Sequence, residues 1–216
     1  MVEVNTSLYS KNKSKLNIVL NVLIVVMAAA LFAVIVFTST YAGIYVVSHS
    51  MNNTLIGAET EKTAGGDYVY VNLRAKPDYG DIVVIDRGDG KTIIKRVIAF
   101  GGDRVKLIRG DLWIKYAGED EFVFVEENYV SPENNTPSYN NFYVETGYLV
   151  EKDCLFLLGD NRNVSIDSRE NNGTSFPIKN LFGVVTDWSL KYKEFFSAVH
   201  RYFYFDLPRS FGFKNS

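Results

Sequence analysis

A run of 22 residues, 16–37, constrains this chain more than any other feature, because 20 of its residues are apolar. At about 1.5 Å per residue, a helix of this length spans roughly 33 Å, close to the ~30 Å hydrocarbon core of a bilayer. No charged residue occurs between Lys15 and Glu59. We therefore expect an uncleaved membrane-spanning helix rather than a buried globular helix. A cleaved signal peptide is the alternative, but its apolar core is typically only about 7–15 residues long.

The residues before this run predict its orientation. Lys11, Lys13 and Lys15 precede it, with only Glu3 opposing them. By the positive-inside rule, the N-terminus faces the cytoplasm. We therefore expect a cytoplasmic tail at residues 1–15, a transmembrane helix at 16–37 and an extracytoplasmic domain at 38–216.

Composition excludes several classes of protein. The formal net charge of −2 lacks the basic excess that drives nucleic-acid binding, so no nucleic-acid partner is expected. Cys154 is the one cysteine, which rules out an intrachain disulfide framework. One Cys and two His also fall short of the usual zinc-binding patterns.

The outer part of the chain has the pattern of a mainly β fold. Short runs rich in Val, Ile, Tyr and Phe alternate with Gly- and Asn-containing turn signals, which favours a barrel or sandwich. By contrast, residues 117–150 are polar, acidic and Asn-rich, so we expect an inserted exposed lobe, around 104–153, rather than core. The expected strands lie within residues 41–47, 67–73, 81–86, 92–100, 104–108, 111–116, 121–127, 154–160 and 181–188.

Three polar patches could carry chemistry. They are SHSMNNTL at residues 48–55, TIIKRV at 92–97 and GDNRNVSIDSR at 159–169. Taken singly, each has an ordinary structural explanation. The first fits a Ser/Asn-rich turn, the second a solvated lysine on a surface strand, and the third an Asx-turn loop or a surface ion pair.

Taken together, the patches are more specific. SxSMxxTL, GDIVV at residues 80–84, IKRV with GGD at 101–103, and GDNRxxSxDSR follow one N-terminal span in that order. In this arrangement residues 41–188 resemble the bacterial type I signal peptidases. The resemblance implies a signal-peptidase-like β-barrel or sandwich and a membrane-bound serine endopeptidase. Such an enzyme removes signal peptides from exported preproteins, cutting after small residues such as Ala at the first and third positions before the cut.

The resemblance also implies a role for each motif residue. Ser50 takes the place of the nucleophile and Lys95 that of the general base. Ser48 takes the place of an oxyanion-hole donor, and Ser165 that of the serine beside the lysine. The remaining supporting positions are Arg96, Asp160, Asp167 and Arg169.

Simple chemistry agrees with these roles. A lysine with a pKa near 10.4 is neutral in only about one molecule in a few thousand at pH 7, so a catalytic lysine must have a lowered pKa. Burial among Ile93, Ile94, Val97 and Ile98 would lower it. We expect Ser165 to orient the amine by a hydrogen bond, and Asp167 with Arg169 to hold the loop that carries Ser165.

The sequence departs from the family pattern at several positions. His49 replaces a small residue, Asn53 replaces a proline, VIAFGGD replaces VxGxPGD, and Asn163-Val164 replaces the more common Asp-Asn. None removes the nucleophile or the base, so activity is expected. On an extended strand His49 would face away from Ser50, so it is not expected to be the base.

The chain's C-terminal part, residues 195–213, is dense in aromatic residues interleaved with Lys and Arg. It fits either insertion into the lipid interface or a strand or helix packed on the domain, with His200 packed among the rings. The implied partners are exported preproteins, the lipid bilayer and the protein translocase. No cofactor or metal is implied.

Two alternatives remain open from the sequence. One is another Ser–Lys peptidase, such as a self-cleaving repressor, which has neither the anchor nor the GDNRxxSxDSR motif. The other is a peptidase-like assembly factor or dedicated processor for surface pili, with narrow or no general signal peptidase activity.

Overall fold

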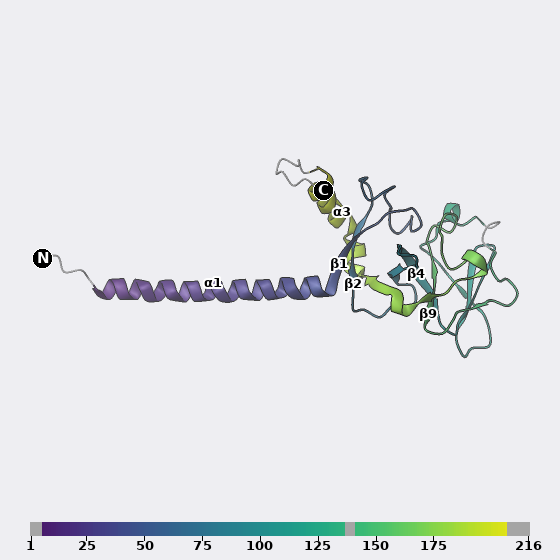
Figure 1. Ribbon diagram of the computed structural model, residues 1–216, viewed down its shortest axis with the longest axis horizontal. Coiled ribbons are helices and arrows are strands. Elements are labelled where there is room, and N and C mark those ends of the chain that lie inside the picture. Colours follow the sequence, from purple (N-terminus) through teal and green to yellow (C-terminus); the bar gives the residue numbers. More distant parts are fainter. Residues whose placement is uncertain (1–5, 137–140, 207–216) are drawn as a thin grey trace. The chain divides into compact units, whose positions relative to one another are not determined.

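The computed structural model describes residues 6–136 and 141–206, and the chain divides into two compact units, Met1–Tyr41 and Ala42–Ser216. The first unit is dominated by one helix, α1 (Thr6–Thr40) (Figure 1). Its segment Lys15–Thr40 is long and apolar enough to cross a membrane. No residue in the most apolar part of this segment is buried. The predicted span at residues 16–37 lies within this segment.

The last turn of α1 keeps its polar groups hydrogen-bonded. The hydroxyls of Thr38 and Thr40 donate to the carbonyls of Val34 and Val36, at 3.0 and 2.8 Å. Ser39 donates to the Val36 carbonyl at 2.9 Å. An unsatisfied polar group is costly in lipid, so these bonds make the threonine and serine side chains compatible with an apolar surrounding.

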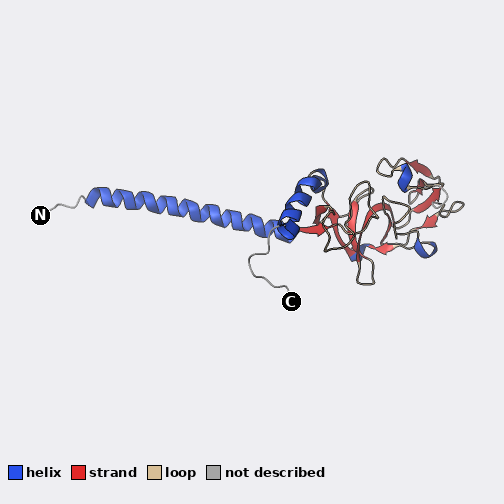
Figure 2. Cartoon of the chain, turned by 90° about the horizontal axis from the view of Figure 1, so that it is seen from above, coloured by secondary structure: helices blue, strands red, loops and turns tan. Residues whose placement is uncertain are grey.

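The second unit is built from two antiparallel sheets (Figure 2). The larger has the order β1-β2-β11-β3-β4-β9-β10, and the smaller β7-β6-β5-β8. The larger contains β1 (Tyr41–Tyr45), β2 (Tyr68–Asn72), β3 (Ile82–Asp86), β4 (Thr92–Phe100), β9 (Cys154–Leu158), β10 (Phe176–Pro177) and β11 (Leu181–Val185). The smaller contains β5 (Arg104–Ile108), β6 (Asp111–Lys115), β7 (Val123–Val125) and β8 (Tyr148–Leu149). This confirms the predicted mainly β fold.

Each of the nine predicted runs contains a strand. Two very short strands, β8 and β10, had no recognisable run. Residues 181–188 are strand only as far as Val185, because α2 (Asp187–Lys191) begins there, followed by α3 (Lys193–Arg201) and a π-helical turn, η4 (Tyr202–Asp206). Single 3-10 turns lie at η1 (Pro132–Asn134), η2 (Glu170–Asn172) and η3 (Ile178–Asn180).

The smaller sheet packs against the larger one. Its inward side chains, such as Leu107 and Ile114, share an apolar cluster with Phe156 and Leu158 of β9. The expectation that residues 117–150 stay out of the core is wrong in part, because Phe142 and Val150 are buried in this cluster. Their polar neighbours concealed them, since acidic and Asn residues separate the short apolar runs of this segment and no regular alternation marks an inward face.

The aromatic C-terminal part forms a helix packed on the domain, as far as residue 206. α3 lies beside β2, and Phe196 packs edge-to-face on Tyr70 with ring centroids 5.3 Å apart (Figure 1). Phe195 and Phe203 remain exposed. The expected aromatic positions Phe211 and Phe213 lie outside the described residues.

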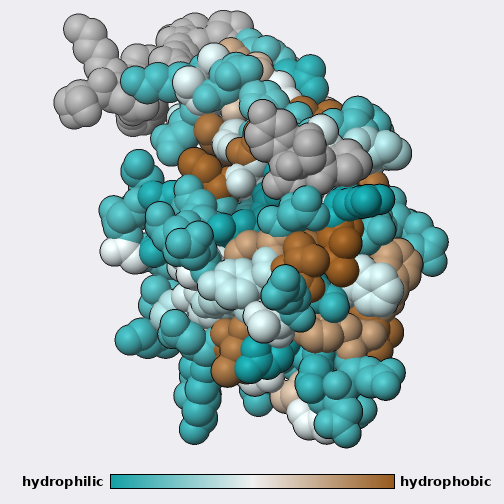
Figure 3. Space-filling view, turned by 90° about the vertical axis from the view of Figure 1, so that its right-hand side faces the viewer, coloured by the Kyte–Doolittle hydropathy of each residue, from teal (hydrophilic) through white to brown (hydrophobic). Residues whose placement is uncertain are grey.

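The face of the molecule seen in Figure 3 is mainly hydrophilic and interrupted by small apolar patches. This contrasts with the almost wholly apolar span of α1. The average composition of the chain therefore combines a segment suited to lipid with a domain suited to water.

Removing the ring of Phe156 should destabilise the sheet-to-sheet contact. Phe156 is 0% exposed, so Phe156→Ala should lower the free energy of unfolding by about 3–5 kcal/mol. Denaturant unfolding of the full chain in detergent, followed by tryptophan fluorescence, measures this. Phe124→Ala is the matched control, because Phe124 is 49% exposed and should cost much less. Equal losses in the two variants would contradict the packing described here.

Candidate active site

Ser50 lies in a turn that follows β1. The side chains of Met51 and Leu55 are fully buried and anchor this turn, and both Thr54 and Leu55 donate backbone hydrogen bonds to the Met51 carbonyl. The Ser50 carbonyl accepts a hydrogen bond from the Asn161 N–H at 3.0 Å. The turn is therefore held both by the apolar core and by the loop after β9.

Lys95 lies in β4, paired in register with Val83 of β3. It is only 3% exposed and Ser50 only 6%. The Lys95 Nζ donates to the Ser50 Oγ at 2.7 Å and to the Ile94 carbonyl at 2.9 Å. The fold thus brings together two residues that lie 45 positions apart in the sequence.

Burial controls the protonation of Lys95. Desolvation lowers the pKa of its amine from 10.5 to about 8, although the negative charges of Asp167 and Asp160 act in the opposite direction. Ile94, Val97 and Ile98, which flank Lys95 along the chain, are buried and Ile93 is half-buried, but these side chains pack in three different apolar clusters. With a pKa of about 8, about a tenth of the amines are neutral at pH 7, instead of about one in a few thousand.

Ser48 lies at the edge of the site in an uncommon backbone conformation. Its φ is +82°, in the left-handed region that non-glycine residues seldom adopt. A Cβ on the facing Gly57 would collide with the Ser48 carbonyl, so the chain passes close by at this point. Such strain costs about 1–3 kcal/mol and commonly occurs at functional sites.

Arg96 and Asp160 form a buried ion pair behind the site. The Arg96 Nε and Nη2 donate to the two carboxylate oxygens of Asp160 at 2.9 and 2.6 Å. The Thr54 hydroxyl donates to the same carboxylate at 2.5 Å, and the Arg96 guanidinium lies 3.8 Å from the centre of the Tyr129 ring. This cluster joins β4, the Ser50 turn and the loop after β9.

Asp167 and Arg169 form a second ion pair, inside the loop that carries Ser165. The Arg169 Nε and Nη2 each donate to an Asp167 oxygen at 2.8 Å. Asp167 also accepts the Gly159 N–H at 3.1 Å, and Arg169 donates to the Arg162 carbonyl at 2.8 Å. These bonds close the loop on itself.

Ser165 does not make the hydrogen bond expected from the sequence. Its Oγ is buried and has no hydrogen-bond partner among the described residues, so it does not contact the Lys95 amine in that way. The amine instead donates to Ser50 and to the neighbouring Ile94 carbonyl. Ser165 still lies close to the site, because a Cβ on Gly159 would collide with both the Ser165 Oγ and the Ser50 carbonyl.

One buried cluster was not recognised from the sequence. The Arg162 Nη2 donates to the Glu127 Oε1 at 2.5 Å, and the Tyr129 hydroxyl donates to the same oxygen at 2.5 Å. Both Arg162 and Glu127 are buried. Arg162 belongs to the motif GDNR, but Glu127 and Tyr129 lie in the segment assigned to an exposed lobe. Their polar surroundings gave no sign of the contact.

Two departures from the family pattern have local structural reasons. Asn53 has a φ of +101°, which a proline cannot adopt because its ring holds φ near about −65°. Its side chain donates to the Tyr129 carbonyl at 2.7 Å. His49 is half-buried and lies 3.6 Å from the Glu59 carboxylate, while the Ser50 hydroxyl is paired with Lys95.

Ser50 and Lys95 open onto a cleft of about 560 Å³. One wall is residues 43–48, which include the end of β1, and another is residues 92–95 at the start of β4. Ser48 lines the same cleft. Within the ranges 6–136 and 141–206, no group of three or more His, Cys, Asp or Glu residues is arranged to hold a metal ion.

Comparison with known proteins gives a consistent result. Residues 18–188 match the family model described as signal peptidase, peptidase S26. The chain is 30% identical over 175 residues to signal peptidase I U of Bacillus subtilis strain 168, covering 77% of this chain and 83% of that protein. It is 28% identical over 183 residues to signal peptidase I P of Bacillus subtilis subsp. natto, covering 82% and 92%. A signal peptidase I structure from Enterococcus faecalis V583 aligns with a TM-score of 0.42 at 24% identity, over 52% of this chain and 98% of that one.

These properties define a hydrolase of the serine peptidase class. The chain belongs to the signal peptidase family, peptidase S26, and is a membrane-anchored enzyme that cleaves signal peptides from preproteins. The predicted family is therefore confirmed, and an assembly factor or a dedicated pilus processor is not favoured.

The buried pair of Glu127 and Arg162 should be essential to stability. Glu127→Ala would leave the Arg162 guanidinium buried without its carboxylate, and should lower the free energy of unfolding by about 3–5 kcal/mol. Asp89→Ala, which removes the solvent-exposed partner of Arg87, is the control and should cause no measurable change. Thermal unfolding of the full chain in detergent compares the two. A harmless Glu127→Ala would show that the lobe does not support the GDNR loop.

Proposed function

We propose that Ser50 is the nucleophile and Lys95 the general base of this signal peptidase. The observation that carries the proposal is the 2.7 Å contact between the Lys95 amine and the Ser50 hydroxyl, at the edge of a cleft and almost shielded from water. A serine hydroxyl is a weak nucleophile until a base takes its proton. A buried lysine with a lowered pKa can act as that base.

The reaction begins when the neutral Lys95 amine accepts the Ser50 hydroxyl proton. The Oγ then forms a bond to the carbonyl carbon of the scissile peptide, giving a tetrahedral oxyanion. The C–N bond breaks as the Lys95 ammonium returns the proton to the leaving amine, so the mature protein departs and an acyl-enzyme remains. Lys95 next takes a proton from water, whose oxygen attacks the ester carbonyl. As the bond to the Ser50 Oγ breaks, Lys95 returns the proton to that oxygen and the signal peptide is released.

The oxyanion would be held by the Ser50 backbone N–H and the Ser48 hydroxyl. No group in the described part of the chain accepts a hydrogen bond from the Ser50 N–H, so this donor is available. The Ser48 side chain is exposed and lines the cleft. Each such donor is typically worth about 3 kcal/mol of transition-state stabilisation.

The cleft suits an extended peptide. β1 is the terminal strand of the larger sheet, and an edge strand can pair its free backbone groups with an added strand. A preprotein lying along residues 43–48 would reach Ser50 in an extended form. We propose small residues such as Ala at the first and third positions before the cut, as the family resemblance implies.

The remaining supporting residues would act through position. Arg96 with Asp160 holds the Ser50 turn through Thr54, and Asp167 with Arg169 holds the Ser165 loop. The Ser165 hydroxyl is unpaired, and we propose that it supports the site from beside Gly159.

The membrane arrangement is also proposed. Residues 1–15 would lie in the cytoplasm and 16–37 would cross the cell membrane. Residues 38–216 would form the extracytoplasmic peptidase domain, with the lobe around 104–153. The basic residues Lys11, Lys13 and Lys15 support this orientation. The lipid bilayer would then hold the apolar part of a signal peptide near the enzyme, as the preprotein leaves the translocase.

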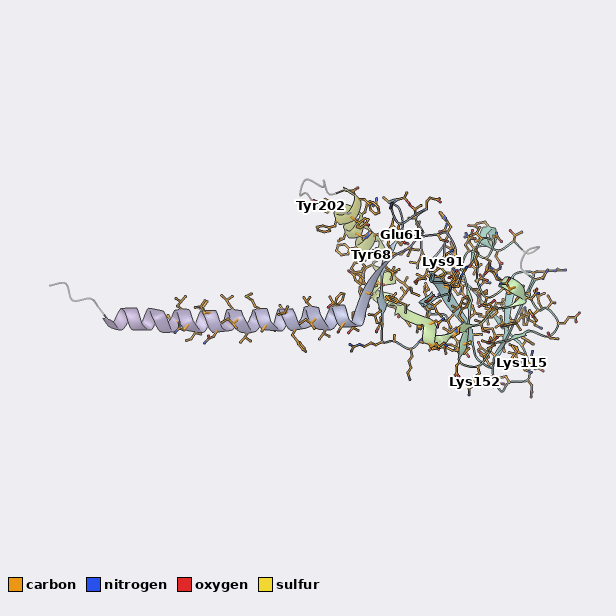
Figure 4. All side chains as sticks on the ribbon, in the orientation of Figure 1. Glu61, Tyr68, Lys91, Lys115, Lys152 and Tyr202 are labelled. Atoms are coloured by element: carbon orange, nitrogen blue, oxygen red, sulfur yellow. The ribbon has the colours of Figure 1, made fainter. Side chains whose placement is uncertain are left out.

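Substitution of the dyad tests the proposal. Ser50→Ala should abolish cleavage of a preprotein at its Ala-x-Ala junction, and Lys95→Met should lower kcat/KM by about 10²–10⁴-fold because the base is lost. The assay uses purified full-length protein in detergent. Lys91→Met is the control, since Lys91 is exposed and should keep wild-type activity (Figure 4). A Lys95→Met variant as active as wild type would disprove the dyad.

The pH dependence follows from the protonation of Lys95. Only the neutral amine can accept a proton, so kcat/KM should fall about tenfold per pH unit below the pKa of about 8 and level off above it. The profile is measured over about pH 6–10 with a substrate that has no ionisable group near the cut. If kcat/KM instead kept rising up to the ordinary lysine pKa of about 10.4, the result would contradict the effect of burial on the pKa of Lys95.

A further inference from the structure

We propose that α3 and the turn after it add a binding subsite to the active-site cleft, and that this subsite receives the end of the signal peptide's apolar segment that lies nearest the cut. The subsite consists of Tyr45, Tyr68, His200 and Tyr204, which line the same cleft as Ser50 and Lys95. This inference rests on the proposed dyad. It adds a means of selecting substrates by residues remote from the cut.

The helical wall lies outside the part of the chain that matches the family model. That match ends at residue 188, whereas α3 begins at Lys193. His200 and Tyr204 nevertheless contribute to the cleft. The family's own motifs therefore do not account for the part of the cleft that His200 and Tyr204 line.

The four side chains form one stacked group. The His200 ring lies 4.4 Å from Tyr68 and 5.3 Å from Tyr204, measured between ring centroids, and is within 16° of parallel to both. The Tyr45 ring stacks on His200 at 4.9 Å. Figure 4 labels Tyr68 at this end of the domain, where β1 and α3 lie. Tyr204 is 58% exposed, so the group presents ring surface to an incoming ligand.

α3 is attached to the domain by hydrogen bonds and an ion pair, in addition to the ring stacking. The Ser197 hydroxyl accepts the Tyr68 N–H at 2.8 Å and donates to the Lys193 carbonyl at 2.6 Å. The Lys193 amine donates to the Thr54 carbonyl at 2.7 Å and pairs with Asp67 at 3.1 Å. Since Thr54 belongs to the turn that carries Ser50, the helix is held in a defined place relative to the nucleophile.

The chemistry of the subsite favours an apolar ligand. Aromatic rings offer large apolar surfaces with low conformational entropy cost. Burial lowers the pKa of His200, so its imidazole is neutral near pH 7. Among the described residues that line the cleft, Glu61 carries a carboxylate and Lys95 an amine. The remaining lining side chains are apolar, aromatic or hydroxyl-bearing.

The occupant follows from the order of parts in a signal peptide. Its apolar segment precedes the small-residue cleavage site, while the mature protein follows it and has no fixed character. The subsite lies at Tyr45, five positions before Ser50 along the wall of the cleft. The proposal takes the substrate to run parallel to residues 43–48. An extended chain advances about 3.3 Å per residue, so the ring group would then meet substrate residues roughly four to seven positions before the cut.

The test compares two substrates and two variants of the full-length protein in detergent. One substrate carries a complete signal peptide with leucines about four to seven positions before the cut. The other is a short peptide with only about three residues before it. His200→Ala/Tyr204→Ala should lower kcat/KM about 5–20-fold on the complete substrate, through KM, and leave the short one unchanged. Tyr202→Ala is the matched control, because Tyr202 is similarly exposed, at 54%, and does not line the cleft.

Each outcome decides the proposal. A selective KM effect that disappears when the leucines are replaced by serines supports the subsite. No loss on the complete substrate overturns it, as does an equal loss on both substrates, which would indicate a structural role of α3. Failure of the dyad looks different, since Ser50→Ala would then cleave both substrates as well as wild type.

Discussion

The burial of the Lys95 amine beside Ser50 is the interaction on which the rest of the site depends. A charged amine strongly prefers water, so placing it in an apolar strand favours its neutral form and makes it a base. Two carboxylates, Asp160 and Asp167, oppose this effect, yet desolvation remains the largest influence on the pKa of Lys95. The carboxylates can be tolerated because each is paired with its own arginine. The site therefore contains negative charges needed for structure without returning Lys95 to its ordinary protonation.

Those ion pairs also explain how two distant motifs meet. Arg96 follows Lys95 directly in β4, and its guanidinium binds Asp160 while Asp160 binds Thr54 of the Ser50 turn. A displacement of β4 relative to that turn would break either this buried ion pair or the hydrogen bond from Thr54 to Asp160, and breaking a buried ion pair is costly. The segment that follows β7 adds a second connection, through Glu127 and Arg162. The segment after β7 thus helps to hold the loop that contains residues 159–169.

Much of the fold and the site could be predicted from local sequence. Strands with apolar runs were recognisable because each buries a continuous face, and the motifs around Ser50, Lys95 and residues 159–169 are long enough to indicate the family. What escaped prediction shares a cause. The burial of Glu127 and of Phe142, and the position of His200 in the active-site cleft, all depend on partners that are distant in sequence. The unpaired hydroxyl of Ser165 likewise depends on side-chain geometry that no motif encodes.

The sequence by itself determined that an apolar span precedes a β-rich domain, and it contained the motifs that led to the proposal of a serine and a lysine as the reactive residues. Hydrophobicity and residue type are local properties, so the chain displays them directly. Tertiary structure alone decided that Lys95 lies 2.7 Å from Ser50, that burial lowers its pKa, and that α3 reaches the same cleft. Those outcomes depend on which segments exclude water from one another. Desolvation is a property of the assembled neighbourhood, and it exists only once the chain has folded.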